Sequence, residues 1–134
     1  MSTIRILMAI IAWPFEPKRL VTPCEYRYFS RRYFKWITVP QGFHYDGATC
    51  APNVGLSFIF HDWLFAYGRF DNGTPIKWRE ANLVMSDIMS DENVPRWVRN
   101  IYRRGINSHH SYKAWLKHRE NDLQHGRVCP VPAP

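Results

Sequence analysis

Apolar positions change their period about one third of the way along the chain. In the first third they form short β-branched or aromatic runs at 4–12, 25–30 and 33–39. Runs of this length, bounded by proline, glycine or polar residues, predict strands. A short link rich in arginine separates the second run from the third, which favours a β-hairpin. A further short strand is predicted at 43–45, after a break that contains proline and glycine.

Beyond this point apolar residues recur every three or four positions, which is the spacing of amphipathic helices. Four helices are predicted, at 56–67, at 76–90, from Asn93-Val94-Pro95 to Gly105, and from Ser108 to about Leu123. Gly68 follows the first helix as a C-terminal cap, because glycine readily adopts left-handed backbone angles. Thr74-Pro75 is typical of a helix start, with a hydroxyl cap and a proline at the first helical position.

Strands followed by helices indicate an α+β fold, in which a small antiparallel sheet from the N-terminal third packs against three or four helices. The 134 residues have the length of a single domain, 1–134. Prolines are frequent at about 126–134, and we expect an extended tail there.

The composition narrows the choice of partners. Lysine and arginine outnumber aspartate and glutamate by 18 to 11, and the net charge of +7 favours nucleic acid, an acidic protein surface or anionic lipid. Aromatic residues make up 16% of the chain, and large aromatic side chains are enriched at protein interfaces. Three cysteines without Cys-x-x-Cys spacing argue against a disulfide scaffold and a zinc ribbon. No apolar run reaches the roughly 20 residues that cross a bilayer, so we expect no transmembrane segment.

Three polar residues form the main candidate for chemistry: Asp46 on a glycine-flanked turn, and His61 and Asp62 inside the first predicted helix. On that helix His61 and Asp62 lie at the border of the apolar stripe, where both can point toward the loop that carries Asp46. One imidazole and two carboxylates suit zinc, and the two carboxylates with loop carbonyls suit calcium. His61 could instead act as a general base on a water molecule that the carboxylates hold.

A structural role for the same three residues is the alternative. Asp46 would then cap a turn, His61 would donate to a backbone carbonyl, and Asp62 would pair with a nearby arginine or lysine. Both interpretations require the three side chains to be bonded, because a buried polar group without a partner costs about 1–3 kcal/mol.

Arginines mark a second candidate site. Arg96, Arg99 and Arg103 lie at positions i, i+3 and i+7 of the third predicted helix, and therefore on one face. Such a face is either a solvated surface or a strip that binds phosphates or acidic groups of a partner. Together with basic residues on the predicted hairpin and the many aromatic rings, the strip is compatible with contact to nucleic acid.

Several segments resemble a known family: Val39-Pro40-x-Gly42-Phe43-x-x-Asp46-Gly47-Ala48-Thr49, His61-Asp62-Trp63-Leu64-Phe65 and Arg79-Glu80-Ala81-Asn82. They are similar to the Val-Pro-x-Gly-Phe-x-Thr-Asp-Gly-Ala-Ser, His-Asp-x-Leu-Tyr and Arg-x-x-Ala-Asp segments of small proteins of unknown function carried by tailed bacteriophages and prophages. The resemblance covers about residues 25–116 and implies a phage or prophage gene. Asn82 departs from it, since the family tends to have aspartate there, and asparagine is a poorer cation ligand.

These observations lead to three hypotheses about function. The first is a phage-encoded accessory protein that acts by binding to other phage structural proteins, as a small component of the virion or tail. The second is a metal-assisted hydrolase of lipid or peptidoglycan, with His61 as base or ligand and Asp46 and Asp62 as ligands of calcium or zinc. The third is a protein of the host cytoplasm that inhibits a host factor or binds nucleic acid through its basic surface.

Overall fold

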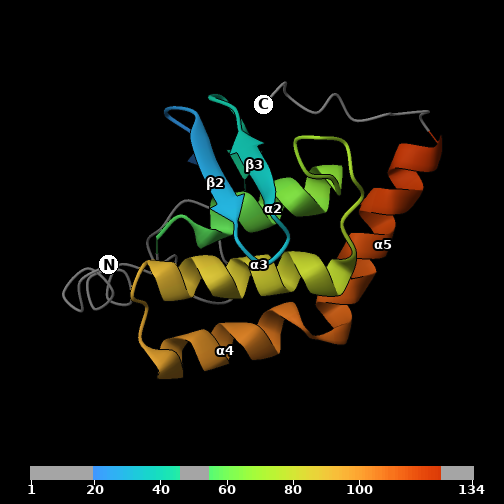
Figure 1. Cartoon of the computed structure of the whole chain (residues 1–134). Helices are drawn as coiled ribbons and strands as arrows, with labels where there is room; N and C mark the ends of the chain where they lie inside the picture. Colours follow the sequence, from blue (N-terminus) through green and yellow to red (C-terminus); the bar gives the residue numbers. More distant parts are fainter. Residues whose placement is uncertain (1–19, 46–54, 125–134) are drawn as a thin grey trace.

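The computed structural model describes residues 20–45 and 55–124 (Figure 1). Within them the α+β prediction is confirmed, since four helices pack with short antiparallel strands from the N-terminal part. The described strands form two separate two-stranded sheets instead of one small sheet. The predicted strand at 4–12, the predicted tail at about 126–134 and Asp46 all lie outside the described residues.

The predicted hairpin is present, with β2 (Tyr26–Ser30) antiparallel to β3 (Lys35–Val39). The second strand begins two residues later than predicted, because Phe34 adopts a left-handed φ of 53° at the end of the turn. Ile37 and Val39 are fully buried and attach the hairpin to the core.

Asp71, in a loop far along the chain, forms hydrogen bonds with the edge of β3. The carboxylate of Asp71 is buried, and it accepts a hydrogen bond from the backbone N–H of Thr38 at 2.7 Å and another from the Thr38 hydroxyl. The backbone N–H of Asp71 donates to the carbonyl of Trp36 at 3.0 Å. These bonds explain why Thr38 is as buried as the apolar residues on either side of it.

The second sheet pairs β1 (Leu20–Val21) with β4 (His44–Tyr45) in antiparallel register. The short strand predicted at 43–45 is therefore confirmed, whereas β1 was not predicted because two residues carry no alternating pattern. Thr22 fixes the connection, since its hydroxyl donates to the carbonyl of Pro40 at 2.7 Å and accepts from the N–H of Phe43 at 2.8 Å.

The four described helices are α2 (Ser57–Tyr67), α3 (Trp78–Asp91), α4 (Arg96–Ile106) and α5 (His109–Gln124). The prediction that Gly68 caps the first helix is confirmed, with a φ of 64° and its N–H bonded to the carbonyl of Leu64. The prediction that a helix starts at Thr74-Pro75 is wrong. Pro75 forms an antiparallel bridge with Arg69, and the N–H of Ile76 donates to the carbonyl of Gly68 at 2.9 Å.

Lys77 caps the start of α3 instead, and its backbone N–H donates to the carboxylate of Glu80 at 3.0 Å. This acid also lies in the first turn of the helix, where a negative charge is favourable to the exposed N–H groups. Two contacts thus determine where α3 starts. The side chain of Glu80 caps the backbone N–H of Lys77, and the loop before it is held by backbone hydrogen bonds to residues 68 and 69.

Figure 1 shows α3 in the middle of the molecule, with the β2–β3 hairpin on one side and α4 on the other. One buried cluster joins the hairpin, α2 and α3, and includes Ile37, Leu64 and Val84. A second cluster joins α2, α3 and α4 and includes Phe58, Met85, Met89, Val94, Val98 and Tyr102. The opposite side of α4 stays open, with Trp97 59% and Ile101 57% exposed.

Helix α5 is anchored to α2 mainly through two side chains. Trp115 is buried, and its ring lies edge-on to that of Phe65 with the centroids 5.2 Å apart. Arg119 lies over the ring of Trp115 and donates to the carbonyls of Phe65 and Ala66 at 2.6 and 3.0 Å. These carbonyls lie in the last turn of α2, where a helix leaves its carbonyls without intrahelical donors. None of the described helices is long and apolar enough to cross a bilayer.

Candidate functional site

His61 lies on α2 and is buried, with only 8% of its surface exposed. Its ring packs against that of Phe65 at a centroid distance of 4.2 Å. The ring nitrogen Nε2 lies 3.0 Å from Oδ1 of Asn82 on α3. The structural alternative predicted that His61 donates to a backbone carbonyl. Instead, His61 bonds to a side chain of the neighbouring helix.

The other hydrogen bonds of Asn82 determine whether Nε2 of His61 donates or accepts in this contact. Its Nδ2 donates to the backbone carbonyl of Ile106 at 2.9 Å and to Oδ1 of Asn107 at 3.2 Å. Because the amide nitrogen serves these two acceptors, Oδ1 is the acceptor that remains, and Nε2 of His61 is the donor. Asn82 is 2% exposed and links α2, α3 and the C-terminal end of α4. We call this set of hydrogen bonds the Asn82 clasp.

Asp62 lies next to the clasp. Its Oδ1 is 3.9 Å from Nδ1 of His61, and its side chain is 26% exposed. Two of the three candidate ligands are therefore neighbours. The third, Asp46, lies outside the described residues, so the three-ligand metal site stays a prediction. Within residues 20–45 and 55–124, no group of three histidine, cysteine or acidic side chains is placed to hold a metal ion.

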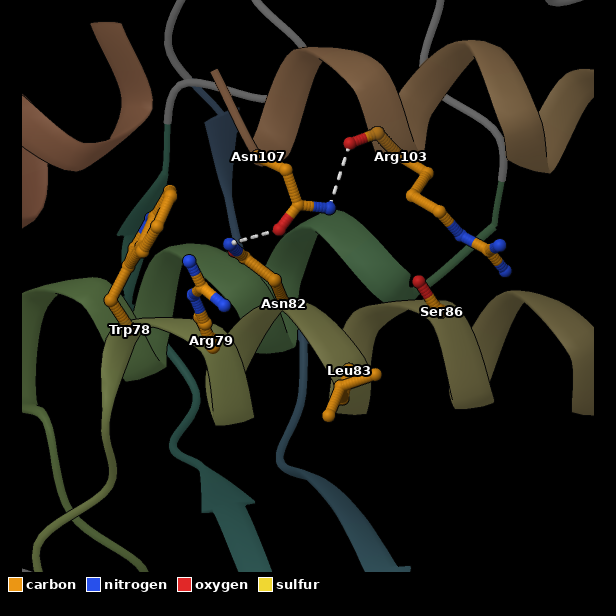
Figure 2. Close-up of a pocket in the computed structure, with 7 residues that line it drawn as sticks. All are labelled: Trp78, Arg79, Asn82, Leu83, Ser86, Arg103 and Asn107. Atoms are coloured by element: carbon orange, nitrogen blue, oxygen red, sulfur yellow. Dashed lines mark hydrogen bonds between the residues drawn. The ribbon is translucent and has the colours of Figure 1, made fainter. Parts of the chain in front are cut away.

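Asn82 also forms the floor of a groove between α3 and α4, with a volume of about 380 Å³ (Figure 2). We call it the α3–α4 groove. Its lining combines basic, polar and aromatic side chains from the two helices and the turn after α4: Trp78, Arg79, Asn82, Leu83, Ser86, Arg103 and Asn107.

The structure places the predicted arginine strip beside this groove. Arg103 lines it, and Arg96 and Arg99 lie within about 60° of Arg103 around α4. Arg96 and Arg103 are exposed, whereas Nε of Arg99 is buried and has no hydrogen-bond partner among the described residues.

Comparison with known families places this arrangement in a wider group. A family described as "Protein of unknown function (DUF1353)" matches residues 19–105. The chain belongs to this family. The match covers His61, Asn82 and the α3 and α4 sides of the groove up to Gly105, but not Asn107. No curated protein and no solved structure matches the chain.

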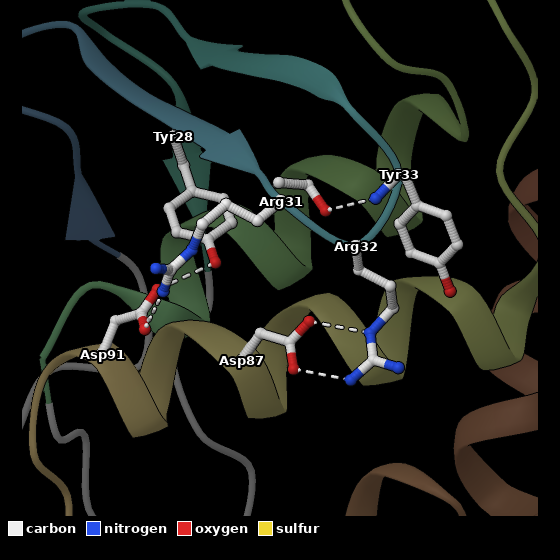
Figure 3. Close-up of polar contacts among 7 residues, drawn as sticks. Tyr28, Arg31, Arg32, Tyr33, Asp87 and Asp91 are labelled. Atoms are coloured by element: carbon white, nitrogen blue, oxygen red, sulfur yellow. Dashed lines mark hydrogen bonds and ion pairs between the residues drawn. The ribbon is translucent and has the colours of Figure 1, made fainter.

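In this family member, two arginines of the hairpin turn are paired with aspartates on the face of α3 that meets the hairpin (Figure 3). Arg31 donates to Asp91 at 3.0 Å, and Arg32 makes two bonds to Asp87, at 2.9 and 2.8 Å. Tyr28 donates to Asp91 as well, at 3.1 Å, and burial together with this bond raises the pKa of the phenol. The hairpin face of α3 is therefore a set of paired charges.

The groove side of α3 has no such pairing. Within the described part of the chain, neither the guanidinium of Arg79 nor that of Arg103 makes an ion pair or a hydrogen bond. No acidic residue among those described lines the groove. The guanidinium groups on this side of α3 and α4 therefore have no acidic partner among the described residues.

Sequence reasoning missed five of the groove residues as site residues: Trp78, Arg79, Leu83, Ser86 and Asn107. Arg79 and Ser86 are seven positions apart and therefore share a helix face. This spacing was a usable signal for one face of α3. It does not reveal which neighbouring helix that face meets, and Asn107 lies beyond the end of α4.

A second cavity, of about 470 Å³, lies between the turn after β3 and α2. Its lining consists of three aromatic side chains, Phe43, Trp63 and Tyr67, together with His44 and the turn residues Pro40, Gln41 and Gly42. The rings of Phe43 and Trp63 meet edge to face at 5.1 Å, which ties this turn to α2.

Proposed function

We propose that this protein acts by binding, as a small accessory component of a phage virion or tail, and that its partners are other phage structural proteins. The observation that carries the proposal is the open side of α4. There two large apolar side chains stand beside arginines that have no acidic partner in the described part of the chain. The motif resemblance to phage and prophage proteins supports the biological setting.

The exposed side chains of α4 are of the types that dominate protein interfaces. Trp97 and Ile101 lie one helical turn apart, with 59% and 57% of their surfaces exposed. Arg104 lies on the same side of the helix and is exposed. Tryptophan and arginine are enriched among the residues that contribute most to binding, and a basic rim favours an acidic partner surface.

The state of His61 supports binding over hydrolysis. A general base needs a ring nitrogen that reaches a water molecule or a substrate in an accessible cavity. Here the ring is buried, and Nε2 donates to Asn82. The hydrogen bonds of Asn82 to the end of α4 give the pair a clear structural task, which is to hold three helices together.

Mass spectrometry of purified virions tests the proposal. We expect the protein in particles at a fixed ratio to the major tail proteins, and a Trp97→Ser variant at a strongly reduced ratio. Phe34→Ser is the matched control, because Phe34 is an aromatic residue that is 81% exposed but lies on the hairpin turn, away from α4. Absence of the wild-type protein from virions, or equal incorporation of both variants, would refute the proposal.

The hydrolase remains the second candidate because Nδ1 of His61 and Oδ1 of Asp62 are only 3.9 Å apart. Metal analysis of the purified protein after incubation with calcium or zinc separates it from the first. A hydrolase should retain one metal per chain and lose it in Asp62→Asn, a variant that preserves the shape of the side chain. A binding protein should retain none and should be unaffected by that substitution.

A further inference from the structure

We propose that the α3–α4 groove binds the phosphodiester backbone of a single nucleic-acid strand. This inference goes beyond the proposed role in a particle, since a purified protein can be tested for it whether or not the protein is packaged. Three observations carry it: positive charge that no described acid compensates, arginines spread over the groove and the adjoining face of α4, and aromatic side chains at one end of the groove.

No acid in residues 20–45 and 55–124 compensates the charge of the groove, because the acids of α3 lie on another face of that helix. Glu80, Asp87 and Asp91 fall on one stripe of the helix, about 100° around from Arg79 and Ser86. Glu80 accepts from the start of α3, while the two aspartates hold arginines of the hairpin. Among the residues that the structure describes, the groove is therefore lined by basic and neutral side chains and by no acid.

The arginines are spread along the groove and do not converge on one point. Figure 2 shows the guanidinium of Arg79 beside Asn82, and that of Arg103 toward Ser86. From Arg103, which lines the groove, the strip continues beside the groove to Arg96, over about 10 Å along α4 at 1.5 Å per residue. Phosphates of a stacked strand follow each other at about 3.4 Å along its axis, so about three of them match this length. A single small anion would be better held by guanidinium groups that converge.

Aromatic side chains at one end of the groove distinguish a nucleic acid from an acidic peptide. Trp78 lines the groove, and its ring packs against that of Tyr112 at 4.9 Å. The indole N–H of Trp78 donates to the hydroxyl of Ser111 at 3.3 Å, and 40% of Tyr112 remains exposed. Unpaired bases stack on such rings without regard to sequence, whereas acidic side chains gain nothing from them.

Fluorescence anisotropy with a labelled 12-nucleotide oligothymidylate tests the inference on the full-length protein. We expect saturable binding at low salt that weakens steeply as the salt concentration rises. Arg79→Gln and Arg103→Gln should each weaken binding, and each should reduce the slope of log K against log salt by about 0.7, which is the contribution of one phosphate contact on a single strand. Tyr112→Leu, which keeps an apolar contact with Trp78, should weaken binding about fivefold or more.

Arg31→Gln is the matched control, because it removes the same charge from the hairpin face, where Arg31 is paired with Asp91. We expect an unchanged salt slope. The inference is overturned if wild-type protein shows no saturable binding at low salt, if Arg31→Gln acts like the groove variants, or if an equally charged polyglutamate peptide binds as tightly as the oligonucleotide. The last result would assign the groove to an acidic protein. Each result is independent of whether virions contain the protein.

Discussion

Asn82 offers the sharpest test of how this fold is held together, because one buried side chain makes three hydrogen bonds to two other parts of the chain. Replacing it with alanine removes all three. At about 1 kcal/mol each they amount to about 3 kcal/mol, and the buried Nε2–H of His61, left without an acceptor, adds about 1–3 kcal/mol. Asn82→Ala should therefore lower the free energy of unfolding by about 4–6 kcal/mol.

Asn82→Asp separates the shape of the side chain from its hydrogen bonding. The carboxylate still accepts from Nε2 of His61, but it cannot donate to the carbonyl of Ile106 or to Oδ1 of Asn107. Two acceptors then face a negative charge, and we expect a loss of about 2–4 kcal/mol at neutral pH. Protonation of the new carboxyl restores one donor, so part of this loss should be recovered as the pH falls.

Urea denaturation followed by tryptophan fluorescence measures both values. Asn100→Ala is the control, because Asn100 is an exposed asparagine on α4 that faces away from the clasp. It should change the free energy of unfolding by less than about 0.5 kcal/mol. If Asn82→Ala costs no more than Asn100→Ala, or if Asn82→Asp is as stable as the wild type at neutral pH, the Asn82 clasp does not stabilise the protein as described.

Three further outcomes follow from single contacts. Gly68→Ala should lower the free energy of unfolding, measured by urea denaturation, by about 2–4 kcal/mol. It places a side chain on a residue with left-handed backbone angles, and the new Cβ meets the guanidinium of Arg119. In an Arg119→Ala background only the backbone cost of about 1–2 kcal/mol should remain. A double-mutant cycle of Arg32→Gln and Asp87→Asn should give a coupling of about 0.5–1 kcal/mol, since the pair is bidentate but partly exposed; zero coupling would contradict this. His118 lies on the exposed side of α5, but partial desolvation, and then the charge of Arg119, lower its pKa below the ordinary value of 6.5. Its contribution to stability should therefore be complete above pH 6.5 and decrease as the pH falls below that value. Melting temperatures between pH 7.5 and 5.5 should drop less in His118→Gln.

Local signals were enough to predict most elements of this fold. A glycine after an apolar stripe marked the end of α2, and an arginine-rich link between two aromatic runs marked the hairpin. The start of α3 was misjudged at Thr74-Pro75 because the competing bonds are not local. They join Arg69 to Pro75 and Ile76 to Gly68, and no propensity of Thr74 or Pro75 reveals them.

The candidate site was only partly predictable for the same reason. His61 and Asp62 stood out as polar residues in an apolar helix, and the arginine strip stood out by its spacing. Residue spacing alone could not identify the partner of His61, because Asn82 is 21 residues away on another helix. Only the family resemblance drew attention to position 82. The groove depends on how α3 and α4 approach each other, and this is set by the packing of Met85 and Met89 against Val98 and Tyr102.

Arg119 couples the stability of α5 to that of the last turn of α2. The side chain closes two carbonyls of the last turn of α2 while it sits on its own helix near Trp115. Fraying of α5 would therefore expose the end of α2 to solvent, and the two segments should open as one cooperative unit. In amide hydrogen exchange we expect the last turn of α2 and the middle of α5 to lose protection together, while the centre of α3 exchanges only on global unfolding.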